Sequence, residues 1–235
     1  FAALVASAAR TTMDNFSMDA SRGIIFMRAS LLNLPAMANA SVTQLPQLSQ
    51  NIRAVVCGAG PSLSRHFDVL KTMRNNYVLV AVGHAVPTLL GQGLTPDLVV
   101  EDDPRSGMDN WPDDMDTASL TLIAATTVDP TLAPRFTRTA WCQASSPAFN
   151  LLAEELTIPL HNMTLYKTVT THAIDVALRL GCDDVALIGQ DFCLSDAGQS
   201  HVDHTTLPAG EQLLYTAANA PGKQVQTTLD LNILR

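Results

Sequence analysis

The stretch Ala54–Leu63, with the sequence Ala-Val-Val-Cys-Gly-Ala-Gly-Pro-Ser-Leu, decides the fold. A short β-forming run enters a glycine-containing turn, and a helical pattern follows directly. Gly58 and Gly60 allow another group to approach the backbone closely, and Pro61 suits the first turn of a helix. Ser62 adds a hydroxyl near backbone N–H groups that attract anions. This strand–turn–helix junction predicts a phosphate-binding turn, and a tight turn without a ligand is the simpler interpretation of the same residues.

Two well-known nucleotide motifs are not present at this turn. Leu63 occupies the third glycine position of the dinucleotide fingerprint, and no acidic residue ends the next strand candidate to hold a ribose. No Gly-Lys-Ser/Thr follows the turn, so the Walker pattern fails as well. A nicotinamide dinucleotide is therefore disfavoured.

Short β-branched runs alternate with helical stretches beyond residue 50, which indicates βαβ units. The strand candidates are Ile52–Cys57, Tyr77–Val82, Leu98–Val100, Leu120–Ala124 and Val185–Ile188. The helix candidates are Ser62–Arg74, Ala85–Gly91 and Thr170–Leu180. Parallel neighbours need a crossover that a helix usually supplies, so we expect an α/β fold, a Rossmann-like, mostly parallel sheet flanked by helices. Ligands of such sheets bind at the carboxyl ends of the strands.

Residues 1–50 are predicted to form a small helical N-terminal appendage and a linker. Ile24, Met27, Leu31 and Leu32 follow helical spacing, and the stretch Asn39–Asn51 is rich in Ser, Gln, Thr and Pro. Residues 51–235 would then form the nucleotide-binding catalytic domain. The first residue is Phe rather than Met, so we expect the chain to be a fragment of a longer protein.

Composition narrows the partners and the compartment. The 235-residue chain carries a net charge of −8, which lacks the cationic surface that nucleic acid requires. No run approaches the roughly 18 apolar residues of a membrane span. The four cysteines show no metal-binding spacing and are predicted to be reduced thiols. We therefore expect a cytoplasmic protein that binds neither nucleic acid nor membranes.

A second candidate site follows the strand Leu98–Val100, where Glu101, Asp102 and Asp103 precede Pro104. Consecutive acids at a strand end can bind hydrated Mg²⁺ or hydrogen-bond to sugar hydroxyls. A solvated acidic turn explains the residues equally well. Asp103 is the preferred functional residue, because a following proline fixes an extended conformation there.

A third candidate site follows the strand Val185–Ile188 and contains Asp191, His201, Asp203 and His204. A carboxylate at a strand end and nearby imidazoles suit general acid–base chemistry. The two histidines and Asp203 could instead bind a metal ion, and histidines of a polar surface loop are the commonest case. The remaining histidines, at positions 66, 84, 161 and 172, are predicted to be structural.

Thr170 and Thr171 lie at the start of the last helix candidate. Their hydroxyls can cap the helix or hold an anionic ligand at its positive end. Capping is the favoured interpretation of the residues alone.

Three segments in this order resemble one family: Gly58–Leu63, then Leu94–Val100 with Asp103 and Pro104, then Leu180–Phe192. They resemble the motility-associated factors, bacterial proteins implicated in adding nonulosonic (sialic-like) acids to flagellin. The catalytic domain of that family is related to the archaeal 6-hydroxymethylpterin diphosphokinases. The resemblance covers residues 50 to 230.

The turn is also similar to the Gly-x-Gly-Pro-Ser turn of sialyltransferases that use CMP-sialic acid. That resemblance implies that Gly58, Gly60, Pro61 and Ser62 contact the nucleotide. It further implies that Thr170 and Thr171 bind the donor phosphate or carboxylate and that His201 is the base, near Asp191.

The resemblance thus implies a glycosyltransferase with a nucleotide-sugar donor, a CMP-activated nonulosonic acid, and a protein acceptor such as flagellin. This reaction requires no cofactor. One alternative is a diphosphokinase that uses ATP, with Mg²⁺ held by Asp102 and Asp103. Another is a nucleotide-binding module without catalytic activity.

Overall fold

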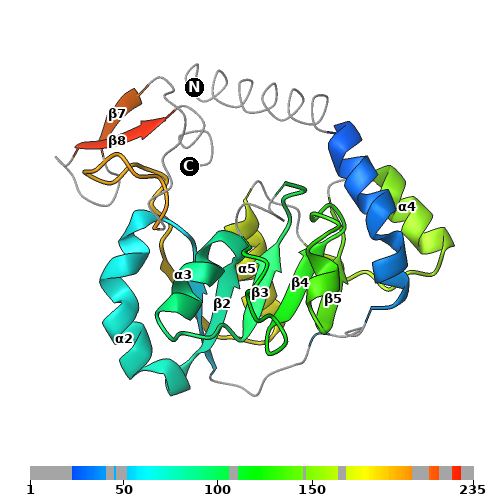
Figure 1. Cartoon of the computed structure of the whole chain (residues 1–235), viewed down its shortest axis with the longest axis horizontal. Coiled ribbons are helices and arrows are strands. Elements are labelled where there is room, and N and C mark those ends of the chain that lie inside the picture. The colour runs from blue at the N-terminus through cyan, green and yellow to red at the C-terminus, as the bar shows by residue number, and fades with distance from the viewer. Residues whose placement is uncertain are drawn as a thin grey trace.

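A computed structural model describes residues 23–40, 45, 52–105, 111–144, 147–163, 168–202, 212–216 and 224–228. Six strands form one sheet in the order β5-β4-β3-β2-β1-β6 (Figure 1). The strands are β1 (Arg53–Cys57), β2 (Val78–Val82), β3 (Leu98–Glu101), β4 (Thr121–Ala125), β5 (Arg138–Cys142) and β6 (Asp184–Ile188). Every neighbouring pair is parallel. The predicted Rossmann-like α/β fold class is confirmed.

The central strands form because their sequences are continuous aliphatic runs, which suit a sheet covered on both faces. All four residues of β3 are buried, and so are the last four of β2 and β4. The sequence prediction missed β5. Its residues Arg-Thr-Ala-Trp-Cys contain no Val or Ile, although Thr and Trp favour strands, and the segment pairs with β4 at the edge of the sheet.

Helices follow most of the strands, with short 3₁₀ segments between them. They are α2 (Phe67–Thr72), α3 (Val86–Gly91), α4 (Pro147–Glu155) and α5 (Val169–Arg179), with η1 (Pro61–His66), η2 (Arg74–Asn76), η3 (Gly83–Ala85) and η4 (Ala133–Arg135). The predicted helix Ser62–Arg74 is therefore divided into 3₁₀ and α segments, and α4 was not predicted. A separate antiparallel pair contains β7 (Gln212–Thr216) and β8 (Gln224–Thr228).

An N-terminal helix over residues 23–38 packs beside the β5 side of the sheet (Figure 1). Met37 is fully buried in the main core. The Asn33 amide donates to the carbonyls of Thr126 (3.1 Å) and Val128 (2.7 Å). This helix is thus attached to the sheet by both apolar and polar contacts, and the predicted domain division near residue 50 stays a prediction.

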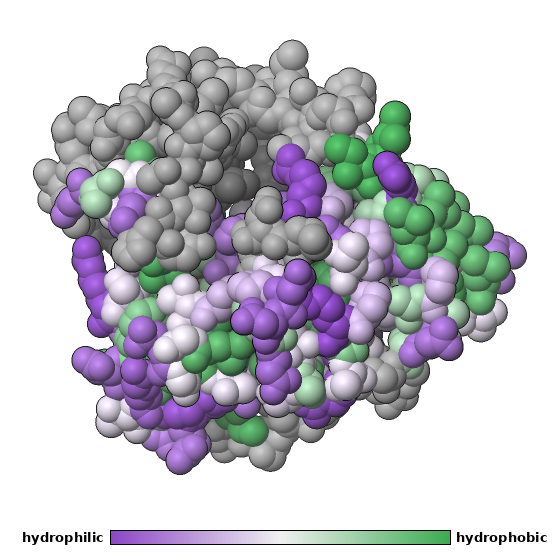
Figure 2. All heavy atoms as spheres, in the orientation of Figure 1, coloured by the Kyte–Doolittle hydropathy of each residue, from purple (hydrophilic) through white to green (hydrophobic). Residues whose placement is uncertain are grey.

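Apolar side chains gather on the surface of this N-terminal helix and of α4 (Figure 2). Ile24 is 81% exposed, and Leu151 and Leu156 of α4 are 64% and 53% exposed. The opposite face of the N-terminal helix carries the buried Met37. This apolar surface lies at the β5 side of the molecule, whereas β6 forms the other edge of the sheet.

The strand order reverses direction at β1. The chain builds β1 to β5 outward on one side and then returns through α5 to place β6 on the other side of β1. Such a reversal leaves a crevice at the carboxyl ends of the two strands that flank it, where α/β sheets bind ligands. The segments that follow β1 and β6 therefore define the place to search for a site.

Within the described ranges, Cys57, Cys142 and Cys182 are buried free thiols, and Cys193 is half-buried. Burial raises the pKa of the Cys57 and Cys142 thiols to about 12, so both stay protonated and unreactive at neutral pH. Of the helices in the described part of the chain, none has the length and apolar character to span a membrane.

Candidate active site

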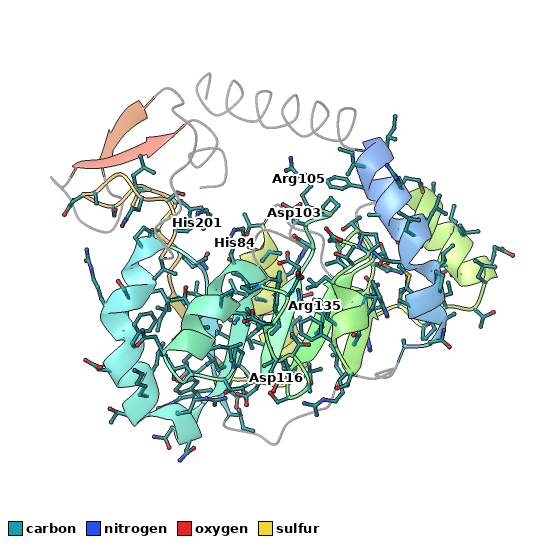
Figure 3. The ribbon with its side chains drawn as sticks, in the orientation of Figure 1. His84, Asp103, Arg105, Asp116, Arg135 and His201 are labelled. Carbon is teal, nitrogen blue, oxygen red and sulfur yellow. The ribbon has the colours of Figure 1, made fainter. Side chains whose placement is uncertain are left out.

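The turns after β1, β2, β3 and β6 meet at the carboxyl edge of the sheet. Figure 3 shows His84, His201 and Asp103 along this edge, with Arg105 beside Asp103 and Asp116 at the opposite edge. Most of the residues singled out from the sequence therefore lie in one region.

Hydrogen bonds join the Gly58–Ser62 turn to the segment after β6. The Gly58 N–H donates to the Ile188 carbonyl (2.8 Å), and the Gly60 N–H donates to the Gly189 carbonyl (2.9 Å). The Ser62 N–H donates to Oδ2 of Asp191 (2.8 Å). Asp191 thus lies beside the turn, and its carboxylate holds the two segments together.

The glycines of the turn are required by these neighbours. A Cβ atom on Gly60 would lie 2.2 Å from Asp191 Oδ2 and 2.7 Å from the Gly189 carbonyl oxygen. A Cβ atom on Gly58 would lie 2.5 Å from that same carbonyl oxygen. Gly189 adopts φ +71°, a conformation that favours glycine. The group that approaches the backbone of Gly60 closely is thus the segment after β6 itself, through the Asp191 carboxylate and the Gly189 carbonyl.

Gly60→Ala is expected to lower the free energy of unfolding by about 1–3 kcal/mol, the usual cost of overpacking. Gly91→Ala is the matched control, because Gly91 ends α3 and a Cβ there meets nothing within 4 Å. That control should stabilise by up to about 1 kcal/mol through the lower entropy of the unfolded chain. Urea unfolding measures both values, and a neutral Gly60→Ala would contradict the packing described for the turn.

The start of α5 is capped by its own hydroxyls, as the residues alone favoured. The Thr168 side chain accepts from the Thr171 N–H, and the Thr171 hydroxyl donates to the Thr168 carbonyl (2.6 Å). Thr170 is buried, and its hydroxyl accepts from the Gln190 side-chain amide (3.0 Å). Gln190 thereby links α5 to the segment after β6, and ligand binding by Thr170 and Thr171 stays a prediction.

Glu101 organises the acidic turn after β3. Its side chain is buried, and Oε1 accepts from the N–H groups of Asp102 (3.0 Å) and Asp103 (3.2 Å). Its Oε2 lies against Gly83, where a Cβ would approach to 1.8 Å. Glu101 therefore contacts both the acidic turn and the residue that precedes His84.

Burial raises the pKa of the Glu101 carboxyl to about 8, and the neighbouring charge of Asp102 adds to the shift. The two backbone hydrogen bonds to Asp102 and Asp103 act in the opposite direction and are outweighed. The carboxyl is thus mostly protonated at neutral pH.

Two histidines that were predicted to be structural lie in this site. His172 Nδ1 is 2.7 Å from Asp102 Oδ2, and both side chains are largely buried. The ring of His84 stacks on that of His201, with centroids 4.9 Å apart and planes at 21°. His84 lies directly after β2 and His172 in the first turn of α5, so their positions at the carboxyl edge were a signal that the sequence prediction did not use.

His201 is held from two sides. The Ser200 hydroxyl lies 2.9 Å from Nδ1 of His201, and the Val202 N–H donates to the Ala59 carbonyl (2.8 Å). These contacts bring the histidine loop to the Gly58–Ser62 turn. Asp203 and His204, the other members of the predicted loop site, lie outside the described residues.

Asp103 is the more exposed of the two predicted metal ligands. Its Oδ1 accepts from the Arg105 N–H (2.9 Å) and lies 3.7 Å from Arg105 Nε. No group of three or more His, Cys, Asp or Glu side chains within the described ranges is arranged to hold a metal ion. A metal ion at this edge would therefore need a substrate or water to supply ligands, which is usual for Mg²⁺.

A Rossmann-like sheet with carboxylates and imidazoles at its carboxyl edge defines an α/β protein with a candidate ligand site at that edge. A family model described as 6-hydroxymethylpterin diphosphokinase MptE-like matches residues 28–197. The chain belongs to this MptE-like family.

Two relatives extend the comparison. An uncharacterized protein from Treponema pallidum (strain Nichols) is 32% identical over 104 residues, which cover 44% of this chain and 49% of the relative. The structure of the MAf glycosyltransferase from Magnetospirillum magneticum AMB-1 matches with a TM-score of 0.66 at 19% identity, over 89% of this chain and 32% of that chain. At this identity the match shows a shared fold.

The chain thus spans about half the length of the first relative and about a third of the solved structure. The suspected relation to motility-associated factors and pterin diphosphokinases is supported by both findings. The similarity of the turn to sialyltransferases stays a prediction.

Proposed function

We propose that this protein is a glycosyltransferase that uses a nucleotide-sugar donor, a CMP-activated nonulosonic acid. The observation that carries the proposal is the stacked pair of His84 and His201 beside the Gly58–Ser62 turn. A base next to a turn that faces the carboxyl edge is the arrangement that transfer to a hydroxyl requires.

In the proposed mechanism His201 removes the proton of an acceptor hydroxyl. The acceptor oxygen forms a bond to the anomeric carbon of the donor sugar while the bond from that carbon to the CMP phosphate oxygen breaks. Ser200, at Nδ1, orients the imidazole so that the other nitrogen, Nε2, takes the proton. The leaving phosphate would be stabilised by the Gly58–Ser62 turn, where it replaces Asp191 as the acceptor of the Ser62 N–H, and by the start of α5 at Thr170.

The donor and acceptor in this proposal rest on the resemblance to the motility-associated factors, which implies a sialic-like donor and flagellin as acceptor. The similar solved structure is named a glycosyltransferase, which supports transfer of a sugar. The transfer itself requires only a hydroxyl group on the acceptor. No metal takes part in this proposal, and a cytoplasmic location fits an activated nucleotide donor.

A diphosphokinase is the second candidate, and the description of the family model favours it. Asp103 fits as a ligand of Mg²⁺ bound to ATP, because its carboxylate is about half exposed beside Arg105. Asp102 fits less well, since its carboxylate already pairs with His172. In that reaction Mg²⁺ would supply charge neutralisation of the ATP phosphates.

Calorimetry with CMP and with ATP, each with and without Mg²⁺, separates the two reactions. The phosphate of a CMP-sugar is a diester with a single negative charge, and the CMP that leaves is a monoester with one charge more. CMP still carries fewer charges than ATP, so it should bind in EDTA with nearly the affinity found in Mg²⁺. Asp103→Asn should leave that CMP affinity unchanged, because its role here is restricted to sugar contacts. Asp116→Asn, at the opposite edge of the sheet, is the matched control.

The opposite result is that ATP binds tightly only when Mg²⁺ is present and that Asp103→Asn abolishes this binding. That result would contradict the proposed glycosyltransferase activity and support the diphosphokinase activity. Binding of CMP without any turnover of a CMP-sugar would support the non-catalytic module instead.

A further inference from the structure

A hollow of about 360 Å³ lies beside His201, on the outer side of the Gly58–Ser62 turn. Three segments form its wall: the η1 segment with the start of α2, the helix α3, and the loop 199–202. The lining residues are Pro61, Ser64, Phe67, Thr88, Gln92, Gln199, His201 and Val202. His201 both borders this hollow and stacks on His84, so it connects the hollow to the candidate site.

Among the described residues that line the hollow there is no Asp, Glu, Lys or Arg. This composition differs from that of the adjoining edge, where Glu101, Asp102, Asp103 and Asp191 lie. A phosphate or carboxylate in the hollow would meet no Lys or Arg among these lining residues, and the neighbouring Lys71 ammonium is already bonded to Gln92 Oε1 (3.2 Å). The ligand that suits this wall is therefore uncharged.

The polar groups of the wall are hydroxyls and amides, which can both donate and accept hydrogen bonds. Ser64 donates its hydroxyl proton to the Pro61 carbonyl (3.0 Å), which leaves the oxygen as an acceptor. Gln92 accepts from Lys71 through Oε1 (3.2 Å), so its amide NH₂ is the donor end of that side chain. Phe67, Pro61 and Val202 add apolar surface between these groups.

A sugar ring suits this wall. The wall combines neutral hydrogen-bonding groups from three segments with one aromatic ring and apolar surface. A sugar presents several hydroxyls around its rim and C–H groups on its faces. A single Ser or Thr hydroxyl would use only one of the five polar side chains present. The chemistry of the wall thus favours a polyhydroxylated ligand.

We propose that this hollow binds the acceptor as an uncharged sugar, whose hydroxyl then faces His201. The inference rests on the proposed function only for the role of His201 as base. The acceptor is then a glycan, and transfer directly to a Ser or Thr side chain is the competing outcome of the test.

The test is an NMR titration of the full chain with galactose and with N-acetylglucosamine, followed at the backbone amides of Thr88 and Val202 and at the His201 imidazole. Both sugars should cause saturable shifts, and galactose 1-phosphate should bind more weakly. Thr88→Val should raise the dissociation constant about tenfold through the loss of one buried hydrogen bond. Thr72→Val on α2 is the matched control, because Thr72 bonds only within its own helix, to the Asp68 carbonyl.

Transfer is measured separately, with a CMP-activated sialic acid as donor. Sugar binding at the hollow without any transfer would support the site while contradicting the glycosyltransferase. Two outcomes would overturn the inference. One is a sugar affinity that is unchanged in Thr88→Val. The other is transfer to a Ser/Thr peptide when neither sugar shifts the NMR signals of Thr88, Val202 and His201.

Discussion

Glu101→Gln is expected to gain stability over the parent protein as pH rises from 4.5 to 8. The carboxyl has a pKa of about 8 in the fold and 4.5 as its ordinary value. Because the folded pKa is raised, the contribution of this carboxyl to the stability of the parent is greatest below pH 4.5, where both states hold the proton. That contribution falls by about 1.4 kcal/mol per pH unit between the two values, because only the unfolded chain ionises there.

The glutamine variant keeps an Oε1 acceptor for the N–H groups of Asp102 and Asp103 and cannot ionise. The difference between the two proteins should therefore grow by several kcal/mol across this window. Urea unfolding at pH 5, 6, 7 and 8 measures it. Glu154→Gln on the exposed surface of α4 is the control for the loss of one acid. Parallel curves for parent and Glu101→Gln would show that the buried carboxyl ionises normally.

His201→Ala is expected to lower turnover of a CMP-sugar by at least about 100-fold, the usual contribution of a general base. Donor affinity should change little, because the base acts mainly in the transition state. Ser200→Ala should cause a smaller loss, since it removes only the group that orients Nδ1. Steady-state kinetics and CMP calorimetry on the same samples separate the two effects.

His66→Ala is the matched control, because His66 also lies beside the turn, 3.0 Å from the Ser62 carbonyl, but is not part of the stacked pair. Equal losses in His201→Ala and His204→Ala would point to a shared metal site. Undiminished turnover in His201→Ala would remove the base from the proposed mechanism.

The sequence predicted the sheet well where local pattern and final environment agree. The runs that became β1, β2, β3 and β4 are apolar and largely buried, and β6 was predicted from its apolar run although most of its side chains are exposed. The strand β5 could not be predicted in the same way. It depends on pairing with β4, and Trp141 becomes buried only through tertiary packing.

The candidate site was only partly predictable, because contacts between distant segments define it. Asp191 and His201 were found from their positions after a strand and in a polar loop. The partners His84 and His172 were missed. Nothing in the local sequence shows that His84, in the turn after β2, stacks on a loop more than a hundred positions later. The rule that strand ends converge at the carboxyl edge could have identified His84.

The Asp191 carboxylate accepts the hydrogen bond of the Ser62 N–H, which is the donor that a phosphate bound at this turn would use. Asp191 would therefore compete with an anionic ligand for Ser62. A phosphate must therefore displace the Asp191 carboxylate, whose effective concentration at Ser62 is set by the fold. The apparent affinity for the phosphate equals the intrinsic affinity multiplied by the fraction of molecules in which Asp191 has moved away. Release is favoured by the same exchange, because the carboxylate returns to Ser62 as the phosphate leaves. Asp191 would in this way weaken binding of the nucleotide and speed the departure of the nucleotide after the reaction.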